Sequence, residues 1–107
     1  MEIKPEHITT KEGRRECLEL AREAALGKYR NNRQPHIACL IDSDPRVRWG
    51  AIMMSQVLLD EKIVDEHSQL LALETAVQWE KSPLVRALFE SAIDAIRRHQ
   101  QGGEDVR

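Results

Sequence analysis

Aromatic residues, glycine and proline are scarce in this chain of 107 residues. Aromatic residues make up 4% of the sequence, and there are five glycines and four prolines. β-Sandwiches and barrels rely on aromatic strands and frequent turns, so this composition disfavours them. Charged residues make up 32% and hydrophobic residues 41%, which is ordinary for a folded protein and unlike a disordered one. The length fits one domain.

Cysteine and long apolar runs are also rare. The two cysteines, Cys17 and Cys39, form no CxxC pair, and no apolar run approaches the ~18 residues that span a bilayer. The N-terminal segment MEIKPEHITT is polar and shows no signal peptide. We therefore expect a cytoplasmic protein with two reduced, buried thiols. The sequence leaves a Cys17–Cys39 disulfide open as the alternative.

The chain has no excess of positive charge. Sixteen lysines and arginines stand against eighteen aspartates and glutamates, which gives a net charge of −2, whereas a dedicated duplex-DNA binder usually carries a basic excess. The charges are nevertheless distributed unevenly, because residues 27–50 are locally basic and residues 60–80 are locally acidic. Such polarity can steer a partner, although salt screens it beyond ~8 Å.

Recognisable catalytic and metal-binding motifs are missing. There is no glycine-rich phosphate loop and no GxSxG sequence. His36 and Cys39 have a spacing that places two metal ligands on one helical turn, but a structural zinc site needs four ligands and a catalytic site three. Carboxylate pairs such as Asp42 and Asp44 lie at expected helix ends, where capping explains them. We therefore expect no cofactor, no bound metal and no enzymatic activity.

The sequence does contain apolar side chains at the three- and four-residue spacing of amphipathic helices. No alternating strand pattern of useful length appears, so we predict an all-α fold. Asp44-Pro45 and Ser82-Pro83 mark two helix starts, and Thr9 with Glu12 forms a capping box. About five helices are predicted, over residues 10–30, 36–41, 45–60, from 65 onward, and 83–99. They form one domain over residues 1–99, and residues 100–107 are expected to be a flexible tail.

Two segments of the chain repeat each other at an offset of 38 residues. Pro45-Arg46-Val47-Arg48 matches Pro83-Leu84-Val85-Arg86, and a period of this size is typical of helical solenoids. Asp42 lies six positions before Arg48, and Glu80 lies six positions before Arg86. With these features, the stretches DSDPRVRWGA (42–51) and EKSPLVRALF (80–89) resemble the HEAT repeat.

The resemblance covers residues 36–99, roughly one and a half repeats. The second copy is irregular, because Phe89 stands where the first copy has Ala51. The resemblance implies a short stack of antiparallel helical hairpins closed by capping helices. It also implies a structural ladder between repeats, made of Asp42, Arg48, Glu80 and Arg86. The alternative is an irregular five-helix bundle that uses the same helix starts without being a repeat.

The two tryptophans receive different interpretations. The third helix is expected to have an apolar stripe of Val47, Ala51, Met54 and Leu58. Trp49 and Met53 lie off this stripe and are four residues apart, so they are neighbours on the surface of the helix. Because the other copy has small residues at the equivalent positions, Trp49 and Met53 are a candidate binding hot spot. Packing of Trp49 against the first helix is the alternative. Trp79 is expected to be a lid over the core.

We therefore predict a non-catalytic protein-binding module: a small adaptor, inhibitor or regulatory subunit that acts through a preformed helical surface. No membrane partner is expected, and the sequence does not indicate an oligomeric state. The alternative is a nucleic-acid-binding regulator that uses the basic surface of residues 28–48. The predicted partner-binding residues are an aromatic anchor, its methionine neighbour and a basic rim, namely Trp49, Met53, Arg46, Lys28, Arg30 and Arg33.

Overall fold

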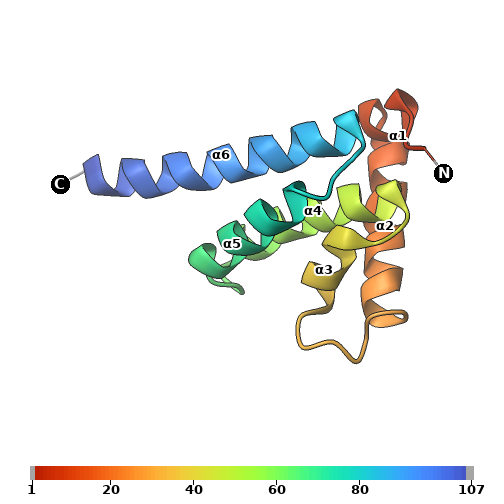
Figure 1. The fold of residues 1–107 in the computed structure, drawn as a ribbon, viewed down its shortest axis with the longest axis horizontal. Coiled ribbons are helices and arrows are strands. Elements are labelled where there is room, and N and C mark those ends of the chain that lie inside the picture. Colours follow the sequence, from red (N-terminus) through yellow and green to blue (C-terminus); the bar gives the residue numbers. More distant parts are fainter. Residues whose placement is uncertain (1, 106–107) are drawn as a thin grey trace.

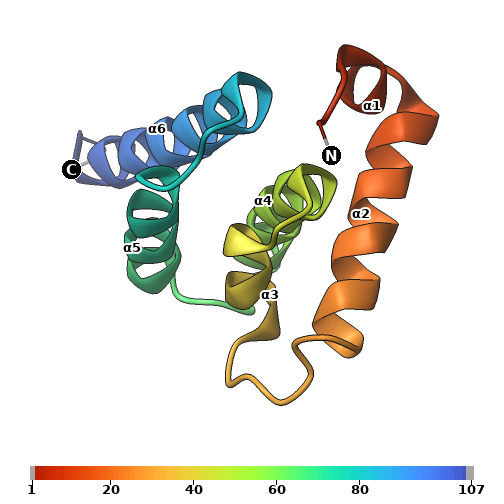
Figure 2. The ribbon, with the colours of Figure 1, turned by 45° about the vertical axis from the view of Figure 1, so that its right-hand side comes forward.

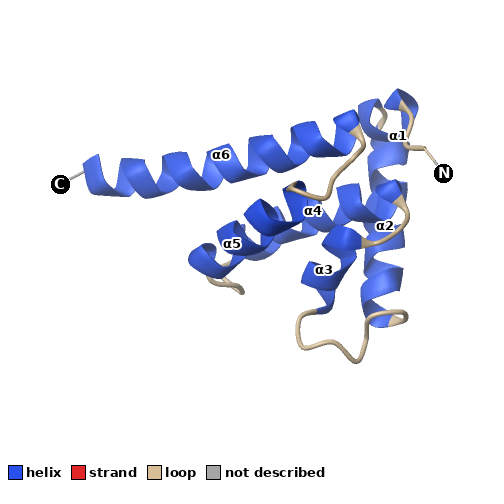
Figure 3. Cartoon of the chain, viewed as in Figure 1, coloured by secondary structure: helices blue, strands red, loops and turns tan. Residues whose placement is uncertain are grey.

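The computed structural model describes residues 2–105, with side chains over residues 2–101, and that part of the chain contains helices and no strand (Figure 3). The all-α prediction is confirmed, and α1 is a sixth α-helix beyond the five predicted. The last helix continues past its predicted end near residue 99, and residues 106–107 of the predicted tail lie outside the described residues. The elements are α1 (Pro5–Thr9), α2 (Lys11–Leu26), α3 (Pro35–Ala38), the 3-10 helix η1 (Cys39–Ile41), α4 (Pro45–Asp60), α5 (Glu66–Val77) and α6 (Pro83–Asp105).

Hydrogen bonds from side chains explain where the helices begin. Asp44 and Asp65 accept from backbone N–H groups in the first turns of α4 and α5. The helix starts predicted at Asp44-Pro45 and near residue 65 are confirmed. The cap of α2 is Thr10, whose Oγ1 accepts from the N–H of Gly13 at 3.0 Å. The prediction of Thr9 at this place is wrong, because Thr9 is the last residue of the additional helix α1.

Helix α4 lies at the centre of the fold (Figures 1 and 2). It contacts α2, α3, η1, α5 and α6, with α2 on one side and the pair of α5 and α6 on the other (Figure 2). Helix α1 packs against α2 near its start. The two outer helices, α2 and α6, expose mainly polar and charged residues.

The central position of α4 explains the burial of Trp49. Val47 and Ala51 are buried as the apolar stripe predicts, but Trp49 and Ile52 are buried as well, at 5% and 0% exposure. A helix covered from more than one direction buries more than one stripe. This corrects the interpretation of Trp49 as an exposed anchor, because its side chain belongs to the core.

Trp79 is the opposite case. It lies in the turn after α5, and 74% of its surface is exposed, so the prediction of a lid over the core is wrong. The next residue, Glu80, takes the buried position, at 5% exposure. The chain therefore turns an acidic side chain inward at this point and leaves the neighbouring tryptophan outside.

Both thiols are free and buried, as expected. The Cys39 thiol donates to the carbonyl oxygen of Ala21 at 3.6 Å, and Cys17 Sγ lies 3.9 Å from the carbonyl oxygen of His7. Burial raises the pKa of each thiol to about 11. Because the thiolate is the reactive form, both cysteines are poor nucleophiles at neutral pH.

Gly50 sets how closely α4 approaches α2. A Cβ added at this position would lie 2.1 Å from the carbonyl oxygen of Cys17, in the backbone of α2. Ala21, also on the buried face of α2, is the next neighbour. A backbone atom in a helix cannot move aside as the end of a flexible side chain can, so a larger residue at position 50 forces the two helices apart.

We predict that Gly50→Ala destabilises the protein by about 2–3 kcal/mol. At an exposed helix position, the same replacement of glycine by alanine would stabilise the helix by ~1 kcal/mol. Urea unfolding followed by circular dichroism measures the difference. Val57→Ala changes an exposed residue of the same helix and serves as the control, with an expected change within about 0.5 kcal/mol. A neutral or stabilising Gly50→Ala would contradict the close helix contact.

Candidate functional site

A bidentate ion pair joins the first turns of α4 to the turn that leads into α6. Arg48 donates from Nε to Glu80 Oε1 at 2.7 Å and from Nη2 to Glu80 Oε2 at 2.8 Å. Arg48 Nη1 also donates to the carbonyl oxygen of Asp42 at 2.7 Å. The Glu80 side chain is 1% exposed and the Arg48 side chain 17%. The charges are thus paired, bonded and largely shielded from water, which is the arrangement that a buried carboxylate requires.

Asp42 extends this network to the loop after α2. Its Oδ2 accepts from Tyr29 Oη at 2.6 Å and from Lys28 Nζ at 3.0 Å, and its Oδ1 accepts from the backbone N–H of Asp44 at 2.8 Å. Burial raises the pKa of Asp42, but the hydrogen bonds from Tyr29, Asp44 and Lys28 more than offset it and hold the pKa below its ordinary value. Lys28 is therefore bonded within the protein.

The turns before α4 and α6 have the same hydrogen bonds. In the first turn, the Asp42 carboxylate accepts from the N–H two residues later, and the Asp42 carbonyl accepts from Arg48. In the second turn, Glu80 Oε2 accepts from the N–H of Ser82 at 3.0 Å, and the Glu80 carbonyl accepts from Arg86 Nη1 at 3.2 Å. The four residues of the expected ladder are thus brought together. Arg48 also donates to the carboxylate of Glu80 in the second turn. The side chain of Arg86 is exposed, and within residues 2–101 it bonds only to the Glu80 carbonyl.

Trp49, the predicted anchor of the partner-binding surface, is not exposed. Trp49 is buried and Met53 is half-buried against the core. The Arg46 side chain is 18% exposed and forms ion pairs with Glu16 and Asp44. Of the predicted rim, only Arg30 and Arg33 are exposed without an ion pair to another residue of the range 2–101.

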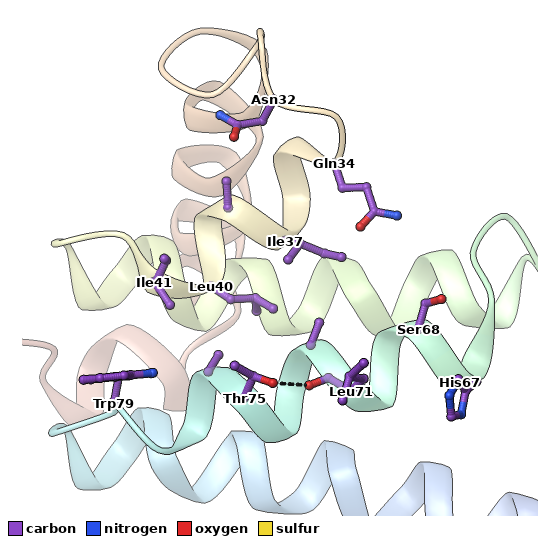
Figure 4. Close-up of a pocket in the computed structure, with 13 residues that line it drawn as sticks. Asn32, Gln34, Ile37, Leu40, Ile41, His67, Ser68, Leu71, Thr75 and Trp79 are labelled. Carbon is purple, nitrogen blue, oxygen red and sulfur yellow. Dashed lines mark hydrogen bonds between the residues drawn. The ribbon is translucent and has the colours of Figure 1, made fainter.

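Three of the six large apolar side chains that are exposed in the described residues lie instead in an open groove between α3–η1 and α5 (Figure 4). The groove has a volume of about 950 Å³, at the upper end of the range for ligand sites. Ile41 and Trp79 lie toward one end, and Ser68 and His67 toward the other (Figure 4). Three apolar side chains lining it are exposed, namely Ile41 at 66%, Leu71 at 59% and Trp79 at 74%.

Local features of the chain place these side chains at the surface. Leu73 is fully buried, so Leu71, two residues earlier on the same helix, points to a different side and into the groove. Ile41 and Trp79 are each followed by a buried acidic residue of the expected ladder, and they are separated by the same 38 positions. Sequence reasoning missed all three residues. Two features of the sequence could have indicated them. Leu71 lies outside the apolar stripe of its helix, and an apolar residue directly precedes each of the two acidic residues of the expected ladder, Asp42 and Glu80.

The lining of the groove contains no Asp, Glu, Lys or Arg side chain, and His67 is its one titratable residue. The carboxylates adjacent in sequence to lining residues are engaged elsewhere: Asp42 with Lys28, Glu80 with Arg48, and two on α5 with basic residues of α6. Asp65 Oδ2, at the start of α5, accepts hydrogen bonds from the backbone N–H and the hydroxyl of Ser68, which lines the groove. The acidic stretch predicted over residues 60–80 is therefore largely turned away from the groove or bonded locally.

The uncommitted charges near the groove are basic. Arg33 lies between Asn32 and Gln34, both of which line the groove. Lys81 lines the adjoining hollow together with Trp79. Both cations are exposed, and neither forms an ion pair with another residue of the range 2–101. Two exposed basic residues thus lie next to lining residues of the groove, one in the loop before α3 and one after Trp79.

A polar contact ties α3 to α5 beside the groove. His36 Nε2 lies 3.3 Å from Gln69 Nε2. The tautomer of His36 and the orientation of the Gln69 amide determine which group donates in this contact. Burial lowers the pKa of His36. Gln69 is fully buried, and its Oε1 has no hydrogen-bond partner among the described residues.

Within the described residues, no three or more His, Cys, Asp and Glu side chains are arranged to hold a metal ion. His36 and Cys39 have separate contacts, with Gln69 and with the backbone of Ala21. No helix in the described part of the chain is both long enough and apolar enough to cross a membrane. Comparisons with protein-family models, with curated proteins and with solved structures found no match.

We predict that Arg48→Ala destabilises the protein by about 3–5 kcal/mol, because it leaves the buried Glu80 carboxylate without its counter-charge. The matched variant is Arg86→Ala at the equivalent place in the second turn, which loses one hydrogen bond to a carbonyl and is expected to cost about 1 kcal/mol. Chemical unfolding measures both. Should Arg48→Ala fail to fold, Arg48→Lys keeps the charge without the bidentate geometry and gives the comparison. Equal losses at the two arginines would contradict the network.

We predict that stability decreases below about pH 6.5, partly through His36. The folded protein favours the neutral imidazole, whereas the unfolded chain takes up a proton as the pH falls through the ordinary histidine pKa of ~6.5. The unfolded state then binds more protons, so the free energy of unfolding falls with pH. His36→Gln lacks the titrating ring and should show a shallower fall between pH 7 and pH 5 in urea titrations. Parallel curves for the two proteins would contradict this role.

Proposed function

We propose that this protein is a short HEAT-like helical-repeat protein that acts as a non-catalytic protein-binding module, such as a small adaptor, inhibitor or regulatory subunit. The observation that carries the proposal is the open groove between α3–η1 and α5, with exposed Ile41, Leu71 and Trp79. Apolar side chains gathered at one exposed place mark an interaction site, whereas single exposed ones are ordinary. The groove replaces the surface around Trp49 as the proposed binding face.

The two equivalent turns support the repeat interpretation. Their acidic residues, Asp42 and Glu80, make the same backbone contacts at an offset of 38 residues, and a helix that begins with proline follows each. Ile41 and Trp79 share that offset. The outer helices α2 and α6 expose mainly polar and charged residues, which is what the terminal elements of a helical array need.

The construction of the groove supports binding by preformed contacts. Its wall on α5 is joined to the wall on α3–η1 through the contact of Gln69 with His36, and Arg48 with Glu80 fixes the turn that carries Trp79. A groove held in shape before binding loses less conformational entropy when a partner docks. An exposed tryptophan beside aliphatic walls supplies a large, stiff contact area, which is typical of a binding hot spot.

Nucleic-acid binding through residues 28–48 has less support. Three of the five cations in that segment, Lys28, Arg46 and Arg48, are bonded to carboxylates. Affinity for a phosphate backbone grows with the number of cations free to displace counterions. Arg30 and Arg33 remain, and the whole chain has a net charge of −2.

We predict that Trp79→Ala weakens binding of the physiological partner by at least ~2 kcal/mol while leaving the helix content and the melting temperature unchanged. Quantitative affinity capture from cells that produce the protein identifies the partner, and titration with the purified partner measures the loss. Leu71→Ala is expected to act in the same direction.

Leu26→Ala provides the matched control, because Leu26 is 68% exposed and lies on α2, outside the groove lining. It should leave binding unchanged. Equal losses for Leu26→Ala and Trp79→Ala, or no loss for Trp79→Ala, would show that the groove is not the binding face.

A further inference from the structure

The lining of the groove determines the kind of side chain that its occupant presents. One wall consists of Ile37 and Ile41, the other of Leu71 and Ala72, and Trp79 lies toward one end (Figure 4). No Asp, Glu, Lys or Arg side chain lines the groove. A charge placed there would be desolvated without a partner, which is unfavourable. The part of the occupant that enters the groove is therefore apolar.

The surroundings of the groove determine the charge of the flanking residues. Arg33 lies in the loop between the lining residues Asn32 and Gln34, and Lys81 lines the hollow that adjoins the groove at Trp79. Both are exposed and without an ion pair in the range 2–101. The neighbouring carboxylates Asp42 and Glu80 are already bonded to Lys28 and Arg48. The free charges at the groove are therefore of one sign, and a partner with the opposite sign is favoured.

We infer that the groove binds a short amphipathic segment of another protein, whose apolar side chains are flanked by acidic residues that pair with Arg33 and Lys81. This inference rests on the proposed function and specifies the chemistry of the partner. The apolar face supplies most of the affinity, and the acidic flanks select the partner and speed its association.

A second copy of this chain fits the groove less well. Two copies that pack groove to groove bring Arg33 and Lys81 of one copy near the same cations of the other, because a two-fold interface uses the same surface twice. Like charges that meet across an interface are unfavourable. The ends of the array, formed by α2 and α6, carry mainly polar and charged residues, so they offer no apolar face for the groove of another copy.

Single-stranded nucleic acid also fits less well. Such ligands need a run of free cations along the backbone and several aromatic side chains on which bases stack. The groove has one exposed tryptophan, Trp79, and its walls are aliphatic.

The test is a selection from a library of displayed peptides in which leucines occupy every third or fourth position and the flanking positions are randomised among Glu, Lys and Ser. We expect selection on the wild-type protein to enrich Glu at the flanks. A selected peptide with Glu flanks is expected to bind about tenfold more tightly than the same peptide with Lys flanks, with a ratio that shrinks as salt is raised.

The double variant Arg33→Glu with Lys81→Glu reverses the charge at the groove and is expected to reverse the preference, so that the Lys-flanked peptide binds more tightly. The matched control is Lys11→Glu with Arg15→Glu, which changes the net charge equally at exposed positions near the start of α2. This control should keep the preference for Glu. Equal effects of the two double variants would overturn the inference.

Three further outcomes separate the inference from the proposed function. Peptides that require Trp79 but show no flank preference overturn the acidic partner and leave protein binding at the groove intact. Peptides that bind Trp79→Ala as well as wild type overturn both. Self-association that Trp79→Ala abolishes, or tighter binding of a single-stranded oligonucleotide than of any selected peptide at ~150 mM salt, overturns the inference in favour of that occupant.

Discussion

The bond between Arg48 and Glu80 is the interaction on which the arrangement of the helices depends. Through one guanidinium, the start of α4 is joined to the carbonyl of Asp42 in its own turn and to the carboxylate of Glu80 in the turn before α6. Asp42 carries the connection onward to Tyr29 and Lys28 after α2. The three long helices of the array are thereby held at their connecting turns. Because the Glu80 side chain is almost fully buried, loss of the arginine would leave an unpaired charge in the interior of the protein.

The same constraint produces the groove. When Asp42 and Glu80 turn inward to make these bonds, the residues directly before them, Ile41 and Trp79, remain outside. Both line the groove, together with Leu71 from α5. The contacts that stabilise the array therefore also expose the apolar side chains that we propose for binding. A rigid base beneath an exposed tryptophan is what a preformed protein-binding surface requires.

Helix α4 shows how packing overrides the pattern on a single helix. Its sequence has one clear apolar stripe, yet Trp49 and Ser55 are buried along with Val47 and Ala51. The helix is covered by α2 from one side and by α6 from another. Gly50 permits the close approach of α2, because a side chain there would collide with the carbonyl oxygen of Cys17. The position of one glycine thus contributes to placing a tryptophan in the core.

The sequence by itself determined the helical class, the helix starts at Asp44-Pro45 and near residue 65, and the two places where an acidic residue precedes an arginine by six positions. These features depend on residues within one or two helical turns of each other, so local spacing predicts them. The cap of α2 was misplaced by one residue because two threonines are adjacent there. Only the tertiary structure decided which tryptophan is buried, whether Leu71 faces the core or the groove, and which cations remain free. Exposure is set by the helix that covers a residue, and that helix comes from a distant part of the chain: Arg48 and Glu80, whose bond fixes the turn beside Trp79, are 32 positions apart.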